Sequence, residues 1–177
     1  MTHTRANLIL LGIAVIWGLA FVFQKSAMEH IGPLLFIALR VTIAVAVLSP
    51  LVIFEARGKG PFLPRGMRRI MIAGGILFFL GAYLQQRGIV TATVTNSGFL
   101  TGLYVVITPV LAWLFCRKLP KKNVWFAVAL AFAGTWLLGG GTIGGFTTGD
   151  GFVAISALFW AMHLLAIERS ATLDRPI

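Results

Sequence analysis

Residues 96–116 read NSGFLTGLYVVITPVLAWLFC, an uninterrupted run without a charged side chain. A helix needs about 20 predominantly apolar residues to cross the hydrocarbon core of a bilayer. Lipid offers no partner to backbone amides, so a span must be a helix or part of a closed barrel, and this run lacks the alternation of a barrel strand. The run therefore predicts a membrane-spanning helix.

Five further apolar runs accompany this one, and the same reasoning makes each of them a membrane helix. They contain one charged residue, Arg40. Charged residues make up only 11% of the chain and hydrophobic residues 58%, whereas a soluble domain carries about 25% charged residues. We expect an all-α, polytopic membrane bundle of about six helices without a soluble domain. The expected spans are 7–24, 31–54, 70–86, 96–116, 124–140 and 151–167.

The loop charges predict an orientation. Lys and Arg cluster at 57–69 and 117–122, whereas the stretch 141–150 carries neither. Cytoplasmic loops carry an excess of these residues, so we expect a cytoplasmic N-terminus and an extracytoplasmic loop at 141–150. The net charge of +10 then reflects topology and contacts with lipid headgroups, and nucleic acid is not an expected partner.

The first and last runs resemble each other. Trp17 is followed by Lys25, and Trp160 is followed at the same spacing by Glu168. Five crossings separate the two runs, so a second copy of the repeat would insert upside down, an arrangement typical of secondary transporters. We therefore expect a protein of roughly 290 residues when complete. Its parts here are one five-helix unit at 1–140, the loop at 141–150, and the first helix of a second, truncated unit at 151–177.

Several short motifs carry a family resemblance that covers nearly all of the chain. They are Trp17-Gly18-x-x-Phe21-x-x-x-Lys25, Pro33-x-x-Phe36-x-x-x-Arg40, Tyr83-Leu84-Gln85-Gln86, the stretch 96–104 followed by Pro109, and Trp160-Ala161 followed by Arg169. With these motifs the chain resembles the EamA-type transporters of the drug/metabolite transporter superfamily. The resemblance implies a ten-helix carrier of the bacterial inner membrane, made of two inverted five-helix units. It also implies export of amino acids, metabolites or drug-like small molecules, with the C-terminal half of the same protein as a partner.

Polar residues in the fourth span predict one wall of a substrate cavity. Ser97, Thr101, Tyr104 and Thr108 fall on one helical face. Hydrogen bonding between helices is the alternative interpretation of this stripe. Pro109 should bend the helix, either as a gating hinge or as a static kink. Gly98 and Gly102, on another face, are expected to pack closely against a neighbouring helix.

The first and last spans add candidate cavity residues. Trp17 and Gln24 share a face in one span, and Trp160 and His163 share a face in the other. Either they line a pocket, or the two Trp side chains pack against neighbouring helices. His163 has a role in proton coupling, or its ring is satisfied by a nearby hydroxyl or carbonyl.

Cations near the outer ends of three spans suggest an electropositive vestibule. Arg40 lies inside the second span without an intramembrane acid to pair with, and Lys25 and Arg87 lie near span ends. Such a vestibule would favour anionic or zwitterionic solutes. Alternatively, Lys25 and Arg87 are ordinary anchors that reach the lipid headgroups. Tyr83 shares a face with Arg87 and completes the expected cavity lining.

The remaining sequence signals limit the chemistry. The chain has no phosphate-binding loop with a lysine, so transport driven directly by ATP is not expected. The spans hold neither paired carboxylates nor a serine–histidine dyad, so we do not expect an enzyme. No metal and no cofactor are expected. The function predicted from the sequence is secondary transport of a small solute, and the alternative is a structural or sensory membrane subunit that does not transport.

Overall fold

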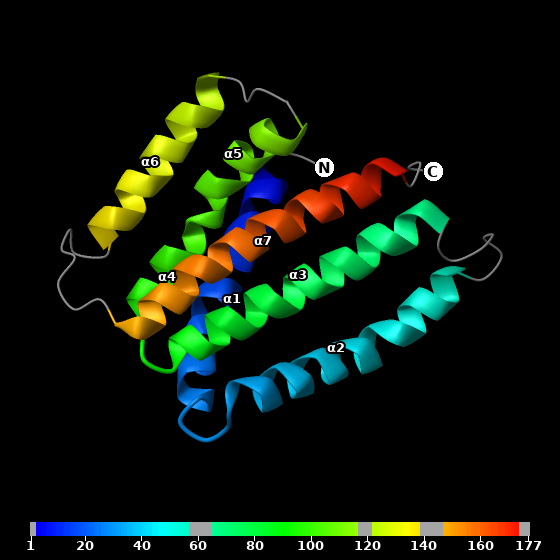
Figure 1. The fold of residues 1–177 in the computed structure, drawn as a ribbon, viewed down its shortest axis with the longest axis horizontal. Coiled ribbons are helices and arrows are strands. Elements are labelled where there is room, and N and C mark those ends of the chain that lie inside the picture. The colour runs from blue at the N-terminus through cyan, green and yellow to red at the C-terminus, as the bar shows by residue number, and fades with distance from the viewer. Residues whose placement is uncertain (1–2, 57–64, 117–121, 139–146, 174–177) are drawn as a thin grey trace.

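A computed structural model describes residues 3–56, 65–116, 122–138 and 147–173 of the 177-residue chain. The described residues form seven α-helices that lie in a splayed bundle (Figure 1). The stretches 57–64 and 117–121 and most of the loop 141–150, which carry the orientation prediction, lie outside the described residues. The helices are α1 His3–Ala27, α2 Pro33–Ala56, α3 Arg65–Ile89, α4 Val94–Gly102, α5 Tyr104–Cys116, α6 Lys122–Leu138 and α7 Thr148–Leu173.

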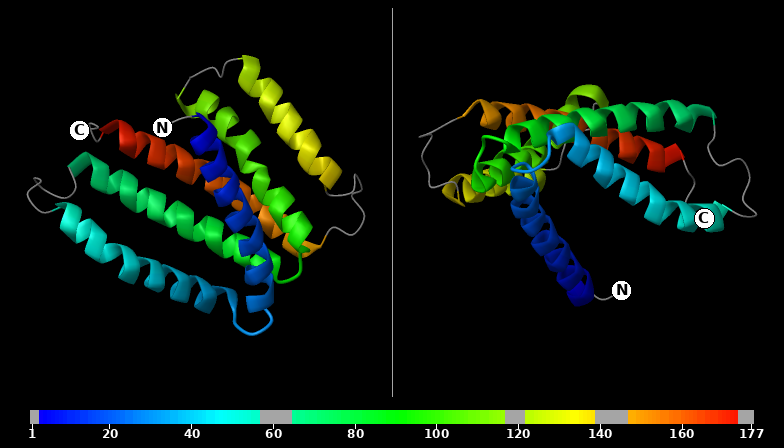
Figure 2. Two further views of the ribbon diagram at one scale, coloured as in Figure 1. Left: turned by 180° about the vertical axis from the view of Figure 1, so that it is seen from behind. Right: turned by 90° about the horizontal axis from the view of Figure 1, so that it is seen from below.

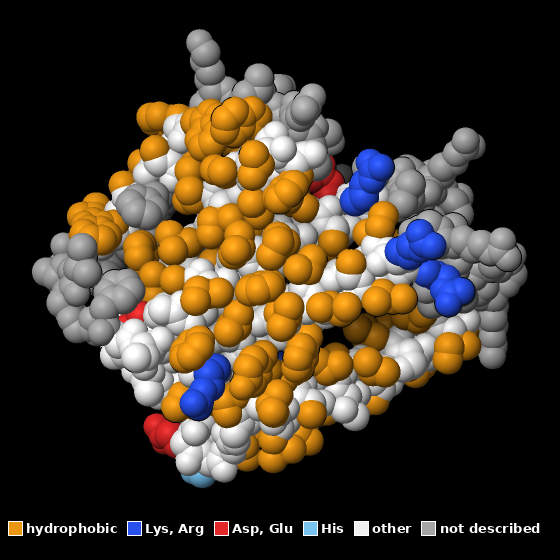
Figure 3. Space-filling view, viewed as in Figure 1, with side chains coloured by type: hydrophobic (Ala, Val, Ile, Leu, Met, Phe, Trp, Pro, Cys, Tyr) orange, Lys and Arg blue, Asp and Glu red, His pale blue; other side chains and the backbone are white. Residues whose placement is uncertain are grey.

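The apolar composition of these helices makes the chain an integral membrane protein. Within the described residues, five stretches are long and apolar enough to cross a bilayer, namely Thr4–Ala27, Pro33–Phe54, Met67–Ile89, Val94–Phe115 and Thr148–Ala171. Hydrophobic side chains cover most of the face in Figure 3, and Lys and Arg gather toward its ends. The prediction of an all-helical, polytopic membrane protein is therefore confirmed.

The sixth predicted span corresponds to α6, which is 17 residues long. That length lies at the lower limit for a spanning helix, about 17–25 residues. The position of α7 supports a crossing by α6. The combined α4 and α5 run away from the end of α3, whereas α7 begins beside that end, where Gly149 touches Gly88. The chain must therefore return across the bundle between α5 and α7, and α6 is the described element that lies between them.

The fourth span is two helices, whereas the sequence predicted one helix bent at Pro109. The interruption lies at Leu103, whose N–H donates to the carbonyl of Leu100 at 3.3 Å. This bond joins residues three apart in sequence, whereas an α-helical bond joins residues four apart. Such tight turns within a helix often mark hinges. Pro109 lies further along, inside α5. The prediction of one continuous helix is therefore wrong. The hinge role of Pro109 stays a prediction.

Closely packed glycines join α3 and α7 in an antiparallel pair. Gly74, Gly81 and Gly88 recur every seventh residue of α3 and face α7. A Cβ at Gly81 would lie 3.4 Å from the Trp160 ring, and a Cβ at Gly88 would lie 2.5 Å from the carbonyl oxygen of Gly149. Small residues let membrane helices approach closely. No described atom lies within 4 Å of a Cβ at Gly98 or Gly102, so close packing at these two glycines stays a prediction.

Lys25 joins α1 to the end of α3. Its ammonium donates to the carbonyl oxygens of Ile89, Val90 and Ala92 at 2.9, 2.9 and 3.0 Å. A cation is favourable at a helix C-terminus, where carbonyl groups lack intrahelical partners. All three ammonium hydrogens thus have acceptors within the protein, so Lys25 is neither a lipid anchor nor a cation available to a vestibule. We call this side of the molecule the Lys25 end.

α7 begins at the Lys25 end with a reciprocal cap. The backbone N–H and hydroxyl of Thr147 donate to Oδ2 of Asp150 at 2.7 and 2.8 Å, and the backbone N–H of Asp150 donates to Oγ1 of Thr147 at 3.2 Å. Such a pair satisfies N–H groups that the first helical turn leaves unpaired. α1 crosses the other helices at an angle, and its N-terminal part points away from them (Figure 2).

Candidate functional site

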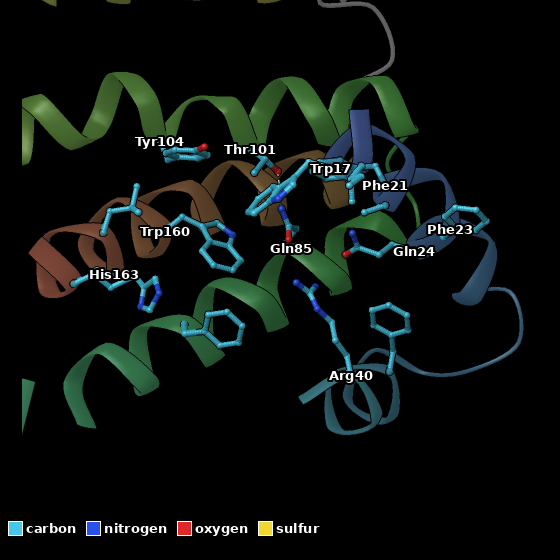
Figure 4. Close-up of a pocket in the computed structure, with 16 residues that line it drawn as sticks. Trp17, Phe21, Phe23, Gln24, Arg40, Gln85, Thr101, Tyr104, Trp160 and His163 are labelled. Atoms are coloured by element: carbon cyan, nitrogen blue, oxygen red, sulfur yellow. Dashed lines mark hydrogen bonds between the residues drawn. The ribbon is translucent and has the colours of Figure 1, made fainter. Parts of the chain in front are cut away.

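A cavity of about 650 Å³ lies among α1, α2, α3, α4, α5 and α7. Pockets for small molecules usually measure about 300–1,000 Å³ and combine apolar walls with a few polar groups. The lining fits that description. Its polar members are Gln24, Arg40, Gln85, Thr101 and His163, and its apolar and aromatic members are Ile16, Trp17, Ala20, Phe21, Phe23, Phe36, Phe78, Tyr104, Trp160, Leu164 and Ile167 (Figure 4).

Most of the side chains expected in a substrate cavity line this one pocket. They come from four separate regions of the chain, and the Trp residues of the proposed repeat, Trp17 and Trp160, lie on the same cavity. The predicted residues found on the lining are Trp17, Gln24, Arg40, Thr101, Tyr104, Trp160 and His163.

Three of the predicted residues do not line the pocket. Ser97 is fully buried, Thr108 donates to the carbonyl oxygen of Tyr104 in its own helix at 2.6 Å, and Tyr83 stacks on Phe79 with a centroid distance of 6.2 Å. Four residues of helix rise about 6 Å. Ser97 and Thr108 thus lie about one turn beyond Thr101 and Tyr104 on either side, so only the middle of the polar stripe lines the cavity.

Gln85 is a lining residue that the sequence did not single out as a site. Its Nε2 donates to Oγ1 of Thr101 at 2.8 Å, and both side chains are buried. This bond fixes the hydroxyl of α4 against α3. A buried amide in a membrane span is costly unless it is paired. The polar side chain of Gln85 in a largely apolar span was therefore the sequence signal that could have identified it as a site residue. Phe78, also missed, gives no such signal because it resembles any other apolar residue of the span.

An aromatic cluster shapes the side of the cavity formed by α3 and α7. The rings of Phe78 and Trp160 meet edge to face with centroids 5.4 Å apart, and His163 lies 5.5 Å from Phe78. Nδ1 of His163 lies 2.8 Å from the carbonyl oxygen of Gly74. A carbonyl oxygen only accepts, so Nδ1 carries a proton and Nε2 is the nitrogen left for another partner. His163 therefore has a backbone carbonyl as a partner, as the alternative to a role in proton coupling predicted.

Polar atoms without a protein partner lie in the pocket wall. Oε1 of Gln24 and Nε1 of Trp160 are buried and have no hydrogen-bond partner among the described residues. Leaving a buried donor or acceptor unpaired costs about 1–3 kcal/mol. In Figure 4 the head groups of Gln24, Gln85 and Arg40 point toward the middle of the pocket, beside the indole ring of Trp160. The arrangement offers donors and an acceptor to a bound solute.

Comparison with known proteins identifies relatives of the chain. The model of the EamA-like transporter family matches residues 4–140. A protein of Archaeoglobus fulgidus described as an uncharacterized transporter is 33% identical over 171 residues, which is 97% of this chain and 51% of that protein. The chain thus spans about half the length of this curated relative. No solved structure matches the chain significantly.

Proposed function

Because the chain belongs to the EamA-like transporter family, we propose that it forms part of the solute pathway of a secondary transporter that works without ATP. The observation that carries the proposal is the cavity of about 650 Å³, whose apolar walls hold unpartnered polar atoms. The proposed activity is export of small molecules such as amino acids, other metabolites or drug-like compounds. Lipid surrounds the apolar outer faces of the helices.

We further propose that residues 1–140 form one five-helix unit and that 151–177 begin a second, inverted unit after the loop at 141–150. Two observations support this. Trp17 and Trp160, at equivalent places in the repeat, line the same cavity. α1 also ends at the Lys25 end, where α7 begins, so the two related helices run in opposite directions. In such transporters the solute site lies between the inverted units.

The proposed orientation places the N-terminus in the cytoplasm of a bacterial cell and the Lys25 end outside it. Lys25 and the Gly88–Gly149 crossing then hold α1, α3 and α7 together on the outer side of the pocket. The N-terminal part of α1, which diverges from the other helices in Figure 2, would lie on the cytoplasmic side. The structure would accordingly correspond to a state closed toward the outside.

Solute counterflow in proteoliposomes tests the proposed function. The 177-residue chain is compared with a form extended to about ten helices. The solutes are radiolabelled phenylalanine, radiolabelled 3-phenyllactate and ethidium. We expect saturable exchange of at least one solute by the extended form and none by the shorter chain. Exchange by the shorter chain would contradict the two-unit proposal, and no exchange of any solute by the extended form would contradict transport.

A further inference from the structure

The charge balance of the pocket points to the class of solute that it selects. Among the described residues that line it, Arg40 is the one side chain with a full charge, and none is acidic. Arg40 has no hydrogen bond or ion pair with the rest of the described chain, and in Figure 4 its guanidinium group points into the pocket. An arginine in a membrane span needs a counter-charge or water. A carboxylate suits a guanidinium group best because two parallel hydrogen bonds can form.

The two unpartnered atoms of the pocket wall require one hydrogen-bond donor and one acceptor on the solute. Oε1 of Gln24 can only accept, and the side chain that carries it is 8% exposed. Nε1 of Trp160 can only donate, so it suits an oxygen of the solute. The solute therefore needs oxygen acceptors for Arg40 and Trp160 and one N–H or O–H donor for Gln24. The aromatic walls accommodate a flat apolar body between these groups.

The same charge balance separates an organic acid from the amino acid with the same skeleton. A monoanion bound to Arg40 gives a neutral complex. A zwitterion adds an ammonium group, for which the described lining provides neutral acceptors such as Oε1 of Gln24 but no carboxylate. A charge buried without an opposite partner is costly, whereas a neutral hydroxyl needs only one acceptor.

We propose that the pocket selects monocarboxylates with an aromatic body and a neutral hydrogen-bond donor next to the carboxylate, in preference to the corresponding amino acids. Arg40 binds the carboxylate with Trp160 as a second donor, and Gln24 accepts from the neutral donor. This inference rests on the proposed function for its biological meaning, but it concerns binding and can fail or succeed independently of transport.

Calorimetric titration of the purified chain in a non-ionic maltoside detergent tests the proposal. The ligands are 3-phenyllactate, its methyl ester, 3-phenylpropionate, phenylalanine and decanoate. We expect 3-phenyllactate to bind about tenfold more tightly than any of the other four ligands. The methyl ester, 3-phenylpropionate and phenylalanine each change one feature, namely the charge, the neutral donor or the neutrality of that donor. Decanoate lacks both the ring and the neutral donor, so the ring is tested by comparing decanoate with 3-phenylpropionate. Equal or tighter binding of phenylalanine, tighter binding of decanoate as a lipid-like acid, or binding of none of the five would overturn the proposal.

Matched variants assign the binding to these residues. Arg40→Gln should weaken binding of 3-phenyllactate by about 10- to 100-fold and leave the methyl ester unaffected, because only the charged ligand loses its partner. Arg87→Gln is the control, since Arg87 is exposed on α3 and does not line the pocket. Gln24→Leu should abolish the preference for 3-phenyllactate over 3-phenylpropionate. Unchanged affinity in Arg40→Gln, or in the milder Arg40→Lys should Arg40→Gln fail to fold, would contradict the assignment.

Discussion

The close crossing of α3 and α7 at Gly88 and Gly149 gives a sharp prediction for Gly88→Ala. A Cβ at this position would lie 2.5 Å from both the carbonyl oxygen of Gly149 and Cγ2 of Val153, and 2.9 Å from the backbone nitrogen of Val153. Two of these three atoms belong to the backbone of α7, so a side-chain rotation cannot relieve the clash. Restoring an ordinary contact of 3.4 Å from 2.5 Å requires α3 and α7 to separate by about 0.9 Å. Overpacking of this kind costs about 1–3 kcal/mol.

The expected result is a lower melting temperature for the purified protein in detergent. A loss of 1 kcal/mol lowers the melting temperature of a protein of this size by about 2–4 °C, so Gly88→Ala should lose about 2–12 °C. Gly75→Ala is the matched control in the same helix, because no described atom lies within 4 Å of its Cβ. Alanine favours a helix over glycine by about 1 kcal/mol, so this control should be neutral or stabilising. A melting temperature for Gly88→Ala equal to or above that of Gly75→Ala would refute the close crossing.

Three further predictions concern other parts of the molecule. Lys25→Met should destabilise the protein by about 1–3 kcal/mol, because three carbonyl groups at the end of α3 lose a charged donor. Thermal unfolding measures this loss, and an unchanged melting temperature would contradict the role of Lys25 in joining α1 to α3. Thr101→Leu should reduce transport by the complete protein about tenfold because it removes the acceptor of Gln85, whereas Ile107→Leu, off the lining, should have little effect; equal losses would indicate general packing damage. Reporter fusions after Lys59 and after Thr147 should report cytoplasmic and extracytoplasmic locations, and the reverse pattern would overturn the proposed orientation.

The sequence predicts the membrane helices well because each depends on a local property. Twenty apolar residues in lipid have to form a helix, and no distant contact changes that. The interruption at Leu103 escaped prediction although Gly102, a poor helix former, directly precedes it, because the spacing of Gly98 and Gly102 was interpreted as a packing motif. The proline signal at Pro109 is strong, but it lies further along the chain.

Contacts between distant segments were harder to predict. The G-x-x-x-G spacing of Gly98 and Gly102 favoured close packing there, yet spacing alone does not tell which helical face meets a partner. Among the described residues, Gly81 and Gly88 of α3 pack closely against residues of α7. The role of Lys25 depends on carbonyl groups that lie more than 60 residues away in sequence, so no local pattern could reveal it.

The candidate site was predicted where polar residues interrupt apolar spans. Trp17, Thr101 and Trp160 were selected on helical faces, and they meet on one cavity. The polar stripe was predicted too long, because helical periodicity gives the direction of a side chain but not the depth at which the cavity ends. Gln85 escaped prediction because it lies on α3, outside the polar stripe of the fourth span, and its bond to Thr101 depends on how the two helices pack.

The central claim is that this pocket is a solute pathway open to water and not a packed helix junction. Cysteine accessibility in native membranes tests it most directly. The chain has a single cysteine, Cys116, so Cys116→Ser provides a cysteine-free background. Two variants on this background, Thr101→Cys and Tyr104→Cys, place a cysteine in the pocket. A third, Ile76→Cys, places one on the lipid-facing side of α3, where Ile76 is 56% exposed. A small charged methanethiosulfonate reagent should modify the two pocket positions and leave the lipid-facing position unmodified. Protection of both pocket positions, under conditions in which an exposed loop cysteine reacts, would contradict the claim.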